Sequence, residues 1–332
     1  MKLISKTLWR LFSYAPLLAL IGTVGISGEA GAQTFTLAET FGSAGGGAGQ
    51  FNAPSYITVD KSNNIIVDDF LNNRIQIFTS SGGYLRSFTT GLYLPLGVAL
   101  DNTGNIYVSN YGNSRIDEFT STGTFIKTAA TPVSLPYGVA VASNGNIYTA
   151  EGHPDDVKVY DSTGTLIKTI GGPGAGNGQF SSPAGIRLDA SGNLYVADQV
   201  NNRVDEFDAS GAFIRTIGSG GHGNGQISDA SDVALDVNGN IYAVDYYNNR
   251  IVEFNNAGVF VQNIGVGDLY QPYGIALDSS GDLFVTDSGH NRIVEYSVPE
   301  AAQTPEPGCM ALLIGSGIAG GLALKRRRMR GL

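Results

Sequence analysis

Carboxylates and arginines recur in this sequence at a fixed spacing. Four times an aspartate is followed five residues later by an arginine, and the turn between them contains asparagine. A carboxylate and a guanidinium at this spacing can form a charge-assisted ion pair that holds the turn. We therefore interpret these residues as structural pairs of a repeating unit. The pairs are Asp69 with Arg74, Asp198 with Arg203, Asp245 with Arg250, and Asp287 with Arg292.

One related segment lacks the arginine. Residues 151–156 read Glu-Gly-His-Pro-Asp-Asp, so three carboxylates and a histidine fall within six positions, and Asp156 replaces the arginine. Carboxylate oxygens are the ligands that calcium prefers. We consider Glu151, His153, Asp155 and Asp156 as candidate ligands of calcium or another divalent cation, although no cofactor is certain. The alternative is a degenerate repeat whose charges are solvated.

These residues must be positioned by the repeat in which they occur. Six copies align on a proline, or Ala230 in one copy, followed twenty residues later by the arginine position, and these positions lie 41 to 47 residues apart. The copies contain short runs of β-branched and aromatic residues bounded by Gly, Asn, Asp and Ser, a pattern typical of strands and tight turns. Four strands in a repeat of this length are typical of a propeller blade. The sequence predicts an all-β, six-bladed β-propeller, since an open β-solenoid would need shorter coils and capping ends.

The two ends of the repeat region predict that the ring is closed. The last copy stops after its third strand, and an unmatched strand, residues 34–41, precedes the first copy. We expect residues 34–41 to pair beside residues 292–297, which removes two open sheet edges. The single cysteine, Cys309, lies outside the repeats, so no disulfide can stabilise the propeller.

Several phrases of the repeat resemble the NHL repeat, over residues 42–298. One copy contains Gly178-Gln179-Phe180, Pro183-Ala184-Gly185-Ile186, Gly192-Asn193-Leu194-Tyr195-Val196-Ala197-Asp198 and Asn201-Asn202-Arg203-Val204. The resemblance implies a propeller but leaves the function open. NHL-like propellers include RNA-binding modules, protein-interaction modules, a peptide amide lyase and extracellular bacterial proteins, and related six-bladed propellers include lactonases. The fold alone does not choose among these functions.

The expected inner strands bear on these alternatives. The amide lyase holds zinc with histidines in its central channel, but the inner strands here carry none. Their middle positions are Thr or Ala except for Arg187, which we expect to point towards the channel and to bind an anion or form a local salt bridge. Lactonase-type propellers hold calcium with Glu, Asn and Asp, and Asn110, Asp198 and Asp245 have suitable chemistry but also fit the structural role. The histidines, all in expected loops, are His153, His222 and His290.

The two ends of the chain read as sorting segments. Residues 1–32 have a basic start, an apolar stretch and a small-residue cleavage site, as in a signal peptide; the alternative is a retained membrane anchor. Residues 299–307 form a linker with the motif Pro305-Glu306-Pro307, and residues 308–332 form an apolar segment with a basic end. This arrangement resembles the PEP-CTERM sorting tail. The resemblance implies an exosortase-type processing protease, transient membrane anchoring by the tail, and delivery to the cell surface or extracellular matrix of a Gram-negative bacterium; the alternative is a permanent tail anchor.

The charge of the repeat region disfavours one class of partner. Residues 33–304 contain 12 Lys and Arg residues and 27 Asp and Glu residues, which gives a formal net charge of −15, whereas the whole chain has −9. An acidic surface repels phosphate backbones. We therefore expect no nucleic-acid partner.

The ligand is expected on the face formed by the loops between blades and the loops after the second strands. Tyrosines beside carboxylates suit a polysaccharide or a protein segment there. The sequence thus favours an exported, non-enzymatic binding module; the alternative is a calcium-dependent, lactonase-like or lyase-like enzyme. Arg187 is the candidate in the channel. The candidates expected to be exposed on this face are Tyr56, Tyr137, Tyr273, Asp232, Glu151 and His153.

Overall fold

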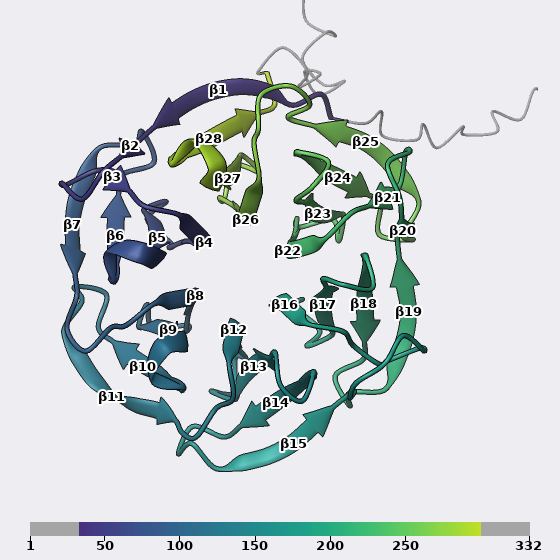
Figure 1. Cartoon of the computed structure of the whole chain (residues 1–332), viewed down its shortest axis with the longest axis horizontal. Helices are drawn as coiled ribbons and strands as arrows, with labels where there is room; N and C mark the ends of the chain where they lie inside the picture. The colour runs from purple at the N-terminus through teal and green to yellow at the C-terminus, as the bar shows by residue number, and fades with distance from the viewer. Residues whose placement is uncertain (1–32, 300–332) are drawn as a thin grey trace, which may run out of the picture. The chain divides into compact units, whose positions relative to one another are not determined.

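Six four-stranded sheets form a ring in the computed structural model, which describes residues 33–299 (Figure 1). This confirms the predicted all-β, six-bladed β-propeller. The sheets are numbered here as blades one to six, in the chain order of their innermost strands. Neighbouring strands within a blade are antiparallel, as in the blade formed by β4 to β7.

In each blade the chain runs from the centre of the ring outwards. The innermost strands are β4 (Pro54–Val59), β8 (Pro95–Leu100), β12 (Pro136–Val141), β16 (Pro183–Leu188), β22 (Ala230–Leu235) and β26 (Pro272–Leu277). The second strands are β5 (Ile65–Asp69), β9 (Ile106–Asn110), β13 (Ile147–Glu151), β17 (Leu194–Asp198), β23 (Ile241–Asp245) and β27 (Leu283–Asp287). The third strands are β6 (Arg74–Phe78), β10 (Arg115–Phe119), β14 (Asp156–Tyr160), β18 (Arg203–Phe207), β24 (Arg250–Phe254) and β28 (Arg292–Ser297). The outer strands are β7 (Tyr84–Phe88), β11 (Phe125–Ala130), β15 (Leu166–Ile170), β19 (Phe213–Ile217), β25 (Phe260–Ile264) and, in blade six, β1 (Thr36–Phe41).

In blades two, four, five and six the turns between the first and second strands contain both an aspartate and a glycine. In blade two, Asp101 Oδ1 accepts hydrogen bonds from the backbone N–H groups of Thr103 and Asn105 at 2.8 and 2.9 Å. Gly104, in the same turn, has a φ of 90°, which side chains with a Cβ rarely adopt. These local bonds explain why Asp and Gly mark the turns in the sequence.

The closing strand lies where the sequence predicts it. β1 pairs antiparallel with β28, from Thr36 opposite Ser297 to Phe41 opposite Ile293, with a register shift between Leu37 and Glu39. Blade six is therefore built from both ends of the repeat region (Figure 1). This pairing covers the free edge of β28 and completes the ring.

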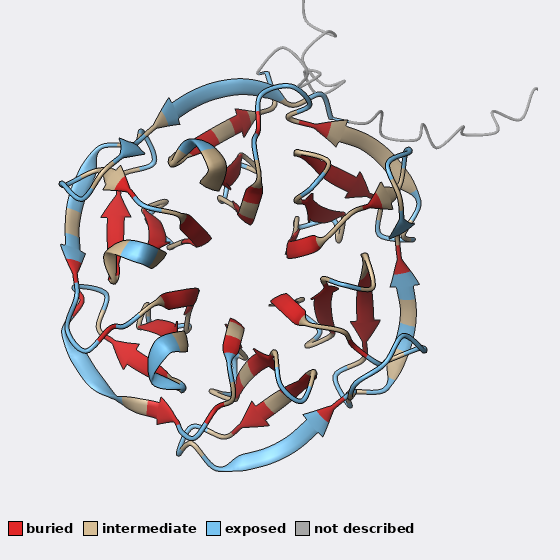
Figure 2. Ribbon diagram, in the orientation of Figure 1, coloured by how far each residue is buried: buried red, intermediate tan, exposed pale blue. Residues whose placement is uncertain are grey.

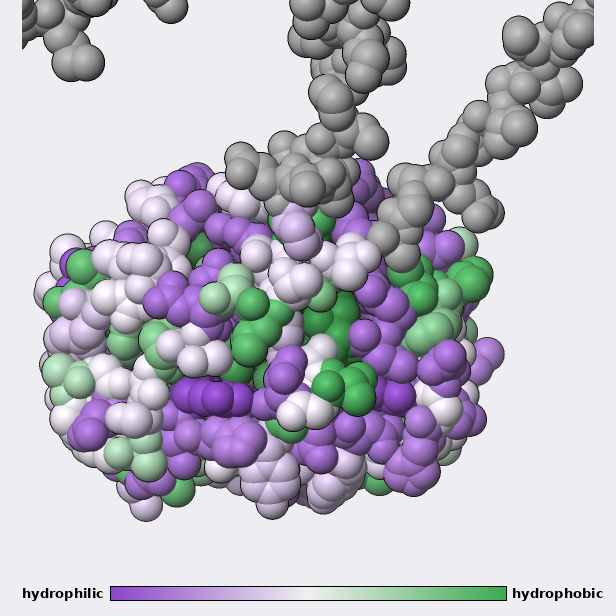
Figure 3. All heavy atoms as spheres, turned by 90° about the horizontal axis from the view of Figure 1, so that it is seen from above, coloured by the Kyte–Doolittle hydropathy of each residue, from purple (hydrophilic) through white to green (hydrophobic). Residues whose placement is uncertain are grey.

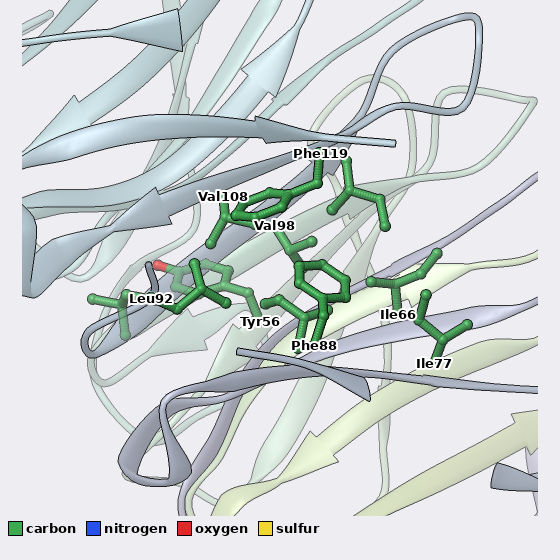
Figure 4. Packing of buried hydrophobic residues seen from close by; sticks show 11 residues of the cluster. Tyr56, Ile66, Ile77, Phe88, Leu92, Val98, Val108 and Phe119 are labelled. Atoms are coloured by element: carbon green, nitrogen blue, oxygen red, sulfur yellow. The ribbon is translucent and has the colours of Figure 1, made fainter. Parts of the chain in front are cut away.

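The core lies between neighbouring blades. Tyr56, Ile66 and Phe88 of blade one pack with Val98 and Phe119 of blade two (Figure 4), and the rings of Phe88 and Phe119 are 4.9 Å apart. The three inner strands of each blade are mostly buried, whereas the outer strands are largely exposed (Figure 2). Viewed edge-on in Figure 3, the side of the ring mixes hydrophilic and hydrophobic residues. Burial between blades thus supplies the apolar stabilisation that a single blade lacks.

Neighbouring blades are also joined by a polar contact, which we call the blade clasp. A residue with a left-handed backbone, just before the third strand, accepts a hydrogen bond from a backbone N–H that precedes the innermost strand of the next blade. Asn73 Oδ1, for example, accepts from Leu94 at 2.7 Å, with φ of 54° at Asn73. The other clasp residues are Asp155, Asn202, Asn249 and Asn291. In blade two this position is Ser114, and its side chain makes no such bond to the described part of blade three.

The glycine-rich segments before blades one, four and five make defined contacts. In the first of them, β2 (Ser43–Ala44) and β3 (Gln50–Phe51) form a short parallel ladder. Arg74 donates to the carbonyl oxygens of Gly46, Gly47 and Gln50 at 2.9, 2.7 and 2.6 Å. Equivalent ladders are formed by Pro173 with Phe180 before blade four and by β20 (Ser219–Gly220) with β21 (Gln226–Ile227) before blade five.

The predicted sorting segments fall beyond the described chain. The signal peptide of residues 1–32, the motif Pro305-Glu306-Pro307 and the apolar tail of residues 308–332 all lie outside residues 33–299. Of the helices found within residues 33–299, none has the length and apolar character needed to cross a membrane. The expectations about export and processing therefore stay predictions.

Candidate binding site at the channel mouth

The aspartate–arginine pairs are present as ion pairs that hold the turns after the second strands. The four Oδ2–Nε distances are 2.7 Å for Asp69–Arg74, 3.2 Å for Asp198–Arg203, 2.7 Å for Asp245–Arg250 and 2.7 Å for Asp287–Arg292. All four carboxylates are buried. Because the guanidinium groups also donate to the preceding loops, as Arg74 does, these pairs position loops and leave no free group for catalysis.

The other carboxylate oxygen has an equally regular partner. In every blade the residue that ends the second strand accepts a hydrogen bond from a backbone N–H seventeen residues earlier; Asn52 thus donates to Asp69 at 2.7 Å. Asn110 does the same for Tyr93 in blade two, and there Arg115 pairs with Asp117 at 2.9 Å. The remaining acceptors are Glu151, Asp198, Asp245 and Asp287. The side chain at this position therefore connects the second strand to the loop before the innermost strand of the same blade. Asn110, Asp198 and Asp245 have this structural role.

Blade three is not left without a cation, contrary to the sequence interpretation. Lys158, two residues beyond the missing arginine, places its Nζ 2.7 Å from Glu151 Oε2. Tyr160 donates its hydroxyl to the other oxygen of Glu151 at 3.0 Å. Glu151 is fully buried, and not exposed as predicted, because both of its carboxylate oxygens are bonded within the blade. The lysine of the third strand thus takes over the role that arginine has in other blades.

The other candidate metal ligands of blade three lie in different environments and do not face one common site. Asp155 is the clasp residue and accepts from Ser182 of blade four at 2.9 Å. Asp156 is buried, and burial, opposed by Lys158, raises the pKa of its carboxyl. His153 is exposed, as are His222 and His290. Within residues 33–299 no three His, Cys, Asp or Glu side chains converge as a metal-binding group, so the structure does not support the blade-three calcium site.

Arg187 crosses the central channel. From β16 of blade four its Nε donates to the carbonyl of Val233 in blade five at 3.2 Å, and its Nη2 donates to Ile275 of blade six at 2.9 Å and to Ile57 of blade one at 3.4 Å. One guanidinium therefore bonds to the innermost strands of three other blades. The expectation that this side chain points to the channel is met, and its partners are carbonyl oxygens.

Asp232 supplies the salt bridge that the sequence allowed for Arg187. Its Oδ2 lies 3.7 Å from Arg187 Nη2 and accepts from the N–H of Ile275 at 3.0 Å, while its Oδ1 accepts from its neighbour Val233. Asp232 is 1% exposed, so its prediction as an exposed ligand residue is wrong: the third position of an innermost strand lies between blades. Burial, opposed by Arg187, raises the pKa of the Asp232 carboxyl to about 6.

The three candidate tyrosines lie together at one mouth of the channel, where the innermost strands begin. Tyr137 and Tyr273 are half-buried and line a pocket of about 340 Å³ with three other aromatic side chains. Tyr56 is not exposed as predicted, because its ring is buried beneath this pocket and meets Tyr273 edge-on at 5.3 Å. The full lining of this mouth pocket is Ala53, Ser55, Phe70, Leu96, Tyr111, Tyr137, Tyr246, Tyr273 and Ser288.

The pocket that Arg187 lines at the opposite mouth is smaller and lacks aromatic side chains. A pocket of about 190 Å³ lies where the innermost strands end, and Arg187 is part of its lining. The other lining residues are Thr58, Val59, Leu188, Ala234, Leu235, Ala276 and Leu277. The aromatic mouth is the better candidate for a ligand site.

Asp68 is a site residue that the sequence interpretation missed. It is fully buried in β5, its Oδ1 accepts from the backbone N–H of Tyr56, and its Oδ2 has no hydrogen-bond partner among the described residues. Burial, together with the charges of Asp69 and Asp232, raises the pKa of Asp68 well above its usual range, although the Tyr56 N–H opposes this. The signal was available, because the equivalent positions hold Ser109, Ala150, Ala197, Val244 and Thr286.

Replacing Asp68 with asparagine is expected to stabilise the protein at neutral pH. Because the pKa of Asp68 is raised, the folded state keeps a proton that the unfolded chain loses above about pH 4. Stability therefore falls as the pH rises from there through the folded-state pKa. Asp68→Asn has no proton to lose, so thermal melting should show a gain of about 1–3 kcal/mol at pH 7–8 and almost none below pH 4.

The neighbouring carboxylate offers a matched control. Asp69→Asn removes the partner of Arg74 and should destabilise the protein at pH 7, although it makes the same chemical change one residue away. An Asp68→Asn protein that melts below the parent at pH 7–8 would contradict the assignment of Asp68 as a buried carboxyl with a raised pKa.

Sequence comparison agrees with this architecture. Family models described as "NHL repeat" match residues 92–119 and 269–296, and one described as "6-bladed beta-propeller" matches residues 189–272. The chain therefore carries NHL repeats in a six-bladed β-propeller. No curated protein matches the chain in sequence.

Similar solved structures include enzymes and a binding protein. Virginiamycin B lyase from Staphylococcus aureus is 13% identical, with a TM-score of 0.59 over 80% of this chain and 100% of the lyase. A gluconolactonase from Xanthomonas campestris is 14% identical, with a TM-score of 0.61 over 75% of this chain and 87% of that chain. An auxiliary nutrient binding protein from Bacteroides thetaiotaomicron is 14% identical, with a TM-score of 0.61 over 74% of this chain and 69% of that chain. At these identities the likeness shows the fold alone.

Proposed function

We propose that this protein is an exported, non-enzymatic binding module whose ligand enters the aromatic mouth pocket. The observation that carries the proposal is the combination of this pocket with the filled channel beneath it. Five blades contribute side chains to the pocket, whereas Arg187 is bonded to three blades across the channel. A concave aromatic surface with a few polar groups is the usual form of a ligand site.

The proposed partners follow the sequence. A polysaccharide or a protein segment fits half-buried tyrosine rings, which offer stacking and hydrogen bonding together. The acidic repeat region disfavours a nucleic acid. The signal peptide and the PEP-CTERM-like tail support processing by an exosortase-type protease, transient membrane anchoring and a final place at the cell surface or in the extracellular matrix.

A lactonase-like or lyase-like enzyme is the second candidate. The fold that this chain shares with such enzymes and the raised pKa of the buried Asp68 favour it, because carboxyls with shifted pKa values often serve as acids or bases. The calcium that a lactonase-type channel implies does not fit here. The carboxylate of Asp232 is already bonded to a guanidinium and two backbone N–H groups, and Arg187 would repel a divalent cation.

Ligand screening against variants of the mouth pocket tests the proposal. Tyr137→Ala and Tyr246→Ala remove one ring each from the pocket and should weaken binding of a polysaccharide or peptide hit by about tenfold or more, since aromatic side chains dominate such sites. Binding would be measured by calorimetry, and thermal melting would confirm that each variant is folded.

Tyr84 provides the matched control. It lies on the outer strand β7, is 40% exposed and packs on Phe78, so Tyr84→Ala removes a comparable ring far from the pocket. This variant should bind as the parent does. A ligand whose affinity is unchanged by both pocket variants would place the binding site elsewhere, and turnover of a lactone by the purified protein would favour the enzyme.

A further inference from the structure

The mouth pocket is enclosed by aromatic rings in several orientations. Phe70, Tyr111, Tyr137, Tyr246 and Tyr273 come from five separate loops or strands, one in each of blades one, two, three, five and six. Tyr111 and Tyr137 lie 5.7 Å apart at 52°, and Tyr246 and Tyr273 lie 6.1 Å apart at 86°. Rings at such angles cannot stack on one flat ligand together, but they can surround a compact one.

The remaining lining is mainly apolar. Besides the rings it consists of Ala53, Leu96 and two serines, with no charged side chain. The face of an aromatic ring carries negative potential and attracts a cation. A primary ammonium group would bring three N–H donors that need acceptors. A quaternary ammonium group has none, and its methyl groups suit an apolar wall.

The charged groups next to the rings are carboxylates. Burial, and after it Tyr111 and Asp155, raises the pKa of Tyr137. Burial also raises the pKa of Tyr273, and Tyr137, Asp229 and Asp68 add to this effect. The charges of Asp155 and Asp229 make the surroundings of the pocket negative, in line with the charge of −15 for residues 33–304.

We propose that the mouth pocket is an aromatic cage for a quaternary ammonium group, such as the trimethylammonium end of a choline-like compound. This inference rests on the proposed function and names the chemistry of the ligand. Two observations carry it, because rings from five blades enclose one pocket and the rest of the wall is uncharged. The charges of Asp155 and Asp229, which act on Tyr137 and Tyr273, agree with a cationic ligand.

Calorimetric titration with choline tests whether the positive charge of the ligand contributes to binding. Choline should bind about tenfold or more tightly than its neutral isostere, in which a tert-butyl group replaces the trimethylammonium, because shape and apolar surface are the same. Glycine betaine should bind more weakly than choline, since its carboxylate approaches the carboxylates of the site. Equal binding of choline and its neutral isostere, or no binding of choline, overturns the inference.

Variants of Tyr246 test whether the aromatic ring of this residue contributes to choline binding. Tyr246→Leu should lose about tenfold in choline affinity, whereas Tyr246→Phe keeps the ring and should stay close to the parent. Tyr84→Leu, on the outer strand, should have no effect. If Tyr246→Phe lost as much as Tyr246→Leu, the hydroxyl and not the ring would be responsible, and the cage would be rejected.

Two further experiments distinguish a lipid headgroup from a free compound and a cationic ligand from a neutral one. Flotation with phosphatidylcholine vesicles distinguishes a lipid headgroup from a free compound, and the quaternary ammonium inference holds for either source if Tyr246→Leu abolishes the binding. A neutral glycan or peptide that loses affinity in Tyr137→Ala, while choline does not bind, would overturn the inference and leave the proposed function intact.

Discussion

A chain that begins at residue 43, and so lacks β1, is expected to lose most of its stability. Backbone pairing with β28 is one cause. The other is that β1 and its flanking residues contact three blades. Phe41 packs 5.3 Å from Phe78 in blade one, and Phe35 lies 5.9 Å from Tyr242 in blade five. We expect a loss of several kcal/mol, which is most of the free energy of unfolding of a domain near the lower end of the usual range of about 5–15 kcal/mol.

Thermal melting followed by circular dichroism would measure this effect. A chain that begins at residue 33 is the control, because it keeps β1 and differs from the truncated chain only in residues 33–42. The two chains are expected to have clearly different melting temperatures. Equal melting would mean that β1 merely covers an edge that the ring does not need.

Arg187→Leu is expected to destabilise the ring by about 3–5 kcal/mol, because it leaves the buried Asp232 without its cation. The carbonyls of Val233, Ile275 and Ile57 lose a donor at the same time. Arg187→Lys should recover only part of the loss, since a single ammonium group lacks the planar fork that reaches three strands.

A double variant separates the charge from the packing. Arg187→Leu combined with Asp232→Asn removes both charges, and it should be more stable than Arg187→Leu alone. Arg86 on the outer strand β7 gives the control, because it donates only to the exposed carbonyl of Ser121 and Arg86→Leu should change stability little. If Arg187→Leu melted with the parent, the guanidinium would not hold the blades.

The sequence predicted the ring because every blade repeats the same local pattern. The strands, the closure by residues 34–41 and the aspartate–arginine pairs each depend on neighbours along the chain or on simple strand counting. Blade three was predicted to lack a cation because the residue that takes over the role of the arginine is not at the arginine position. Lys158 lies two residues after the missing arginine, and only the strand register brings it to Glu151.

The site was predictable only in part. Arg187 stood out because it breaks a series of small residues, and comparing aligned positions would also have found Asp68. Tyr56 and Asp232 were recognised, but their burial was not, since it depends on how one blade covers the next. The mouth pocket joins side chains from residues 53 to 288, and no local pattern indicates which rings meet there.

The pairing of β1 with β28 also determines when the ring can close relative to synthesis of the chain. Thr36 and Ser297 are 261 positions apart, so the first strand of the propeller to emerge receives its partner last. Until then β1 must persist as an unpaired strand, a condition that invites aggregation. Its sequence, Thr-Leu-Ala-Glu-Thr-Phe, carries Glu39 at its middle and exposes most of its side chains even in the finished ring. A strand of this composition can remain solvated while it is unpaired. The closed ring can form only after β28, at the other end of the repeat region, is present.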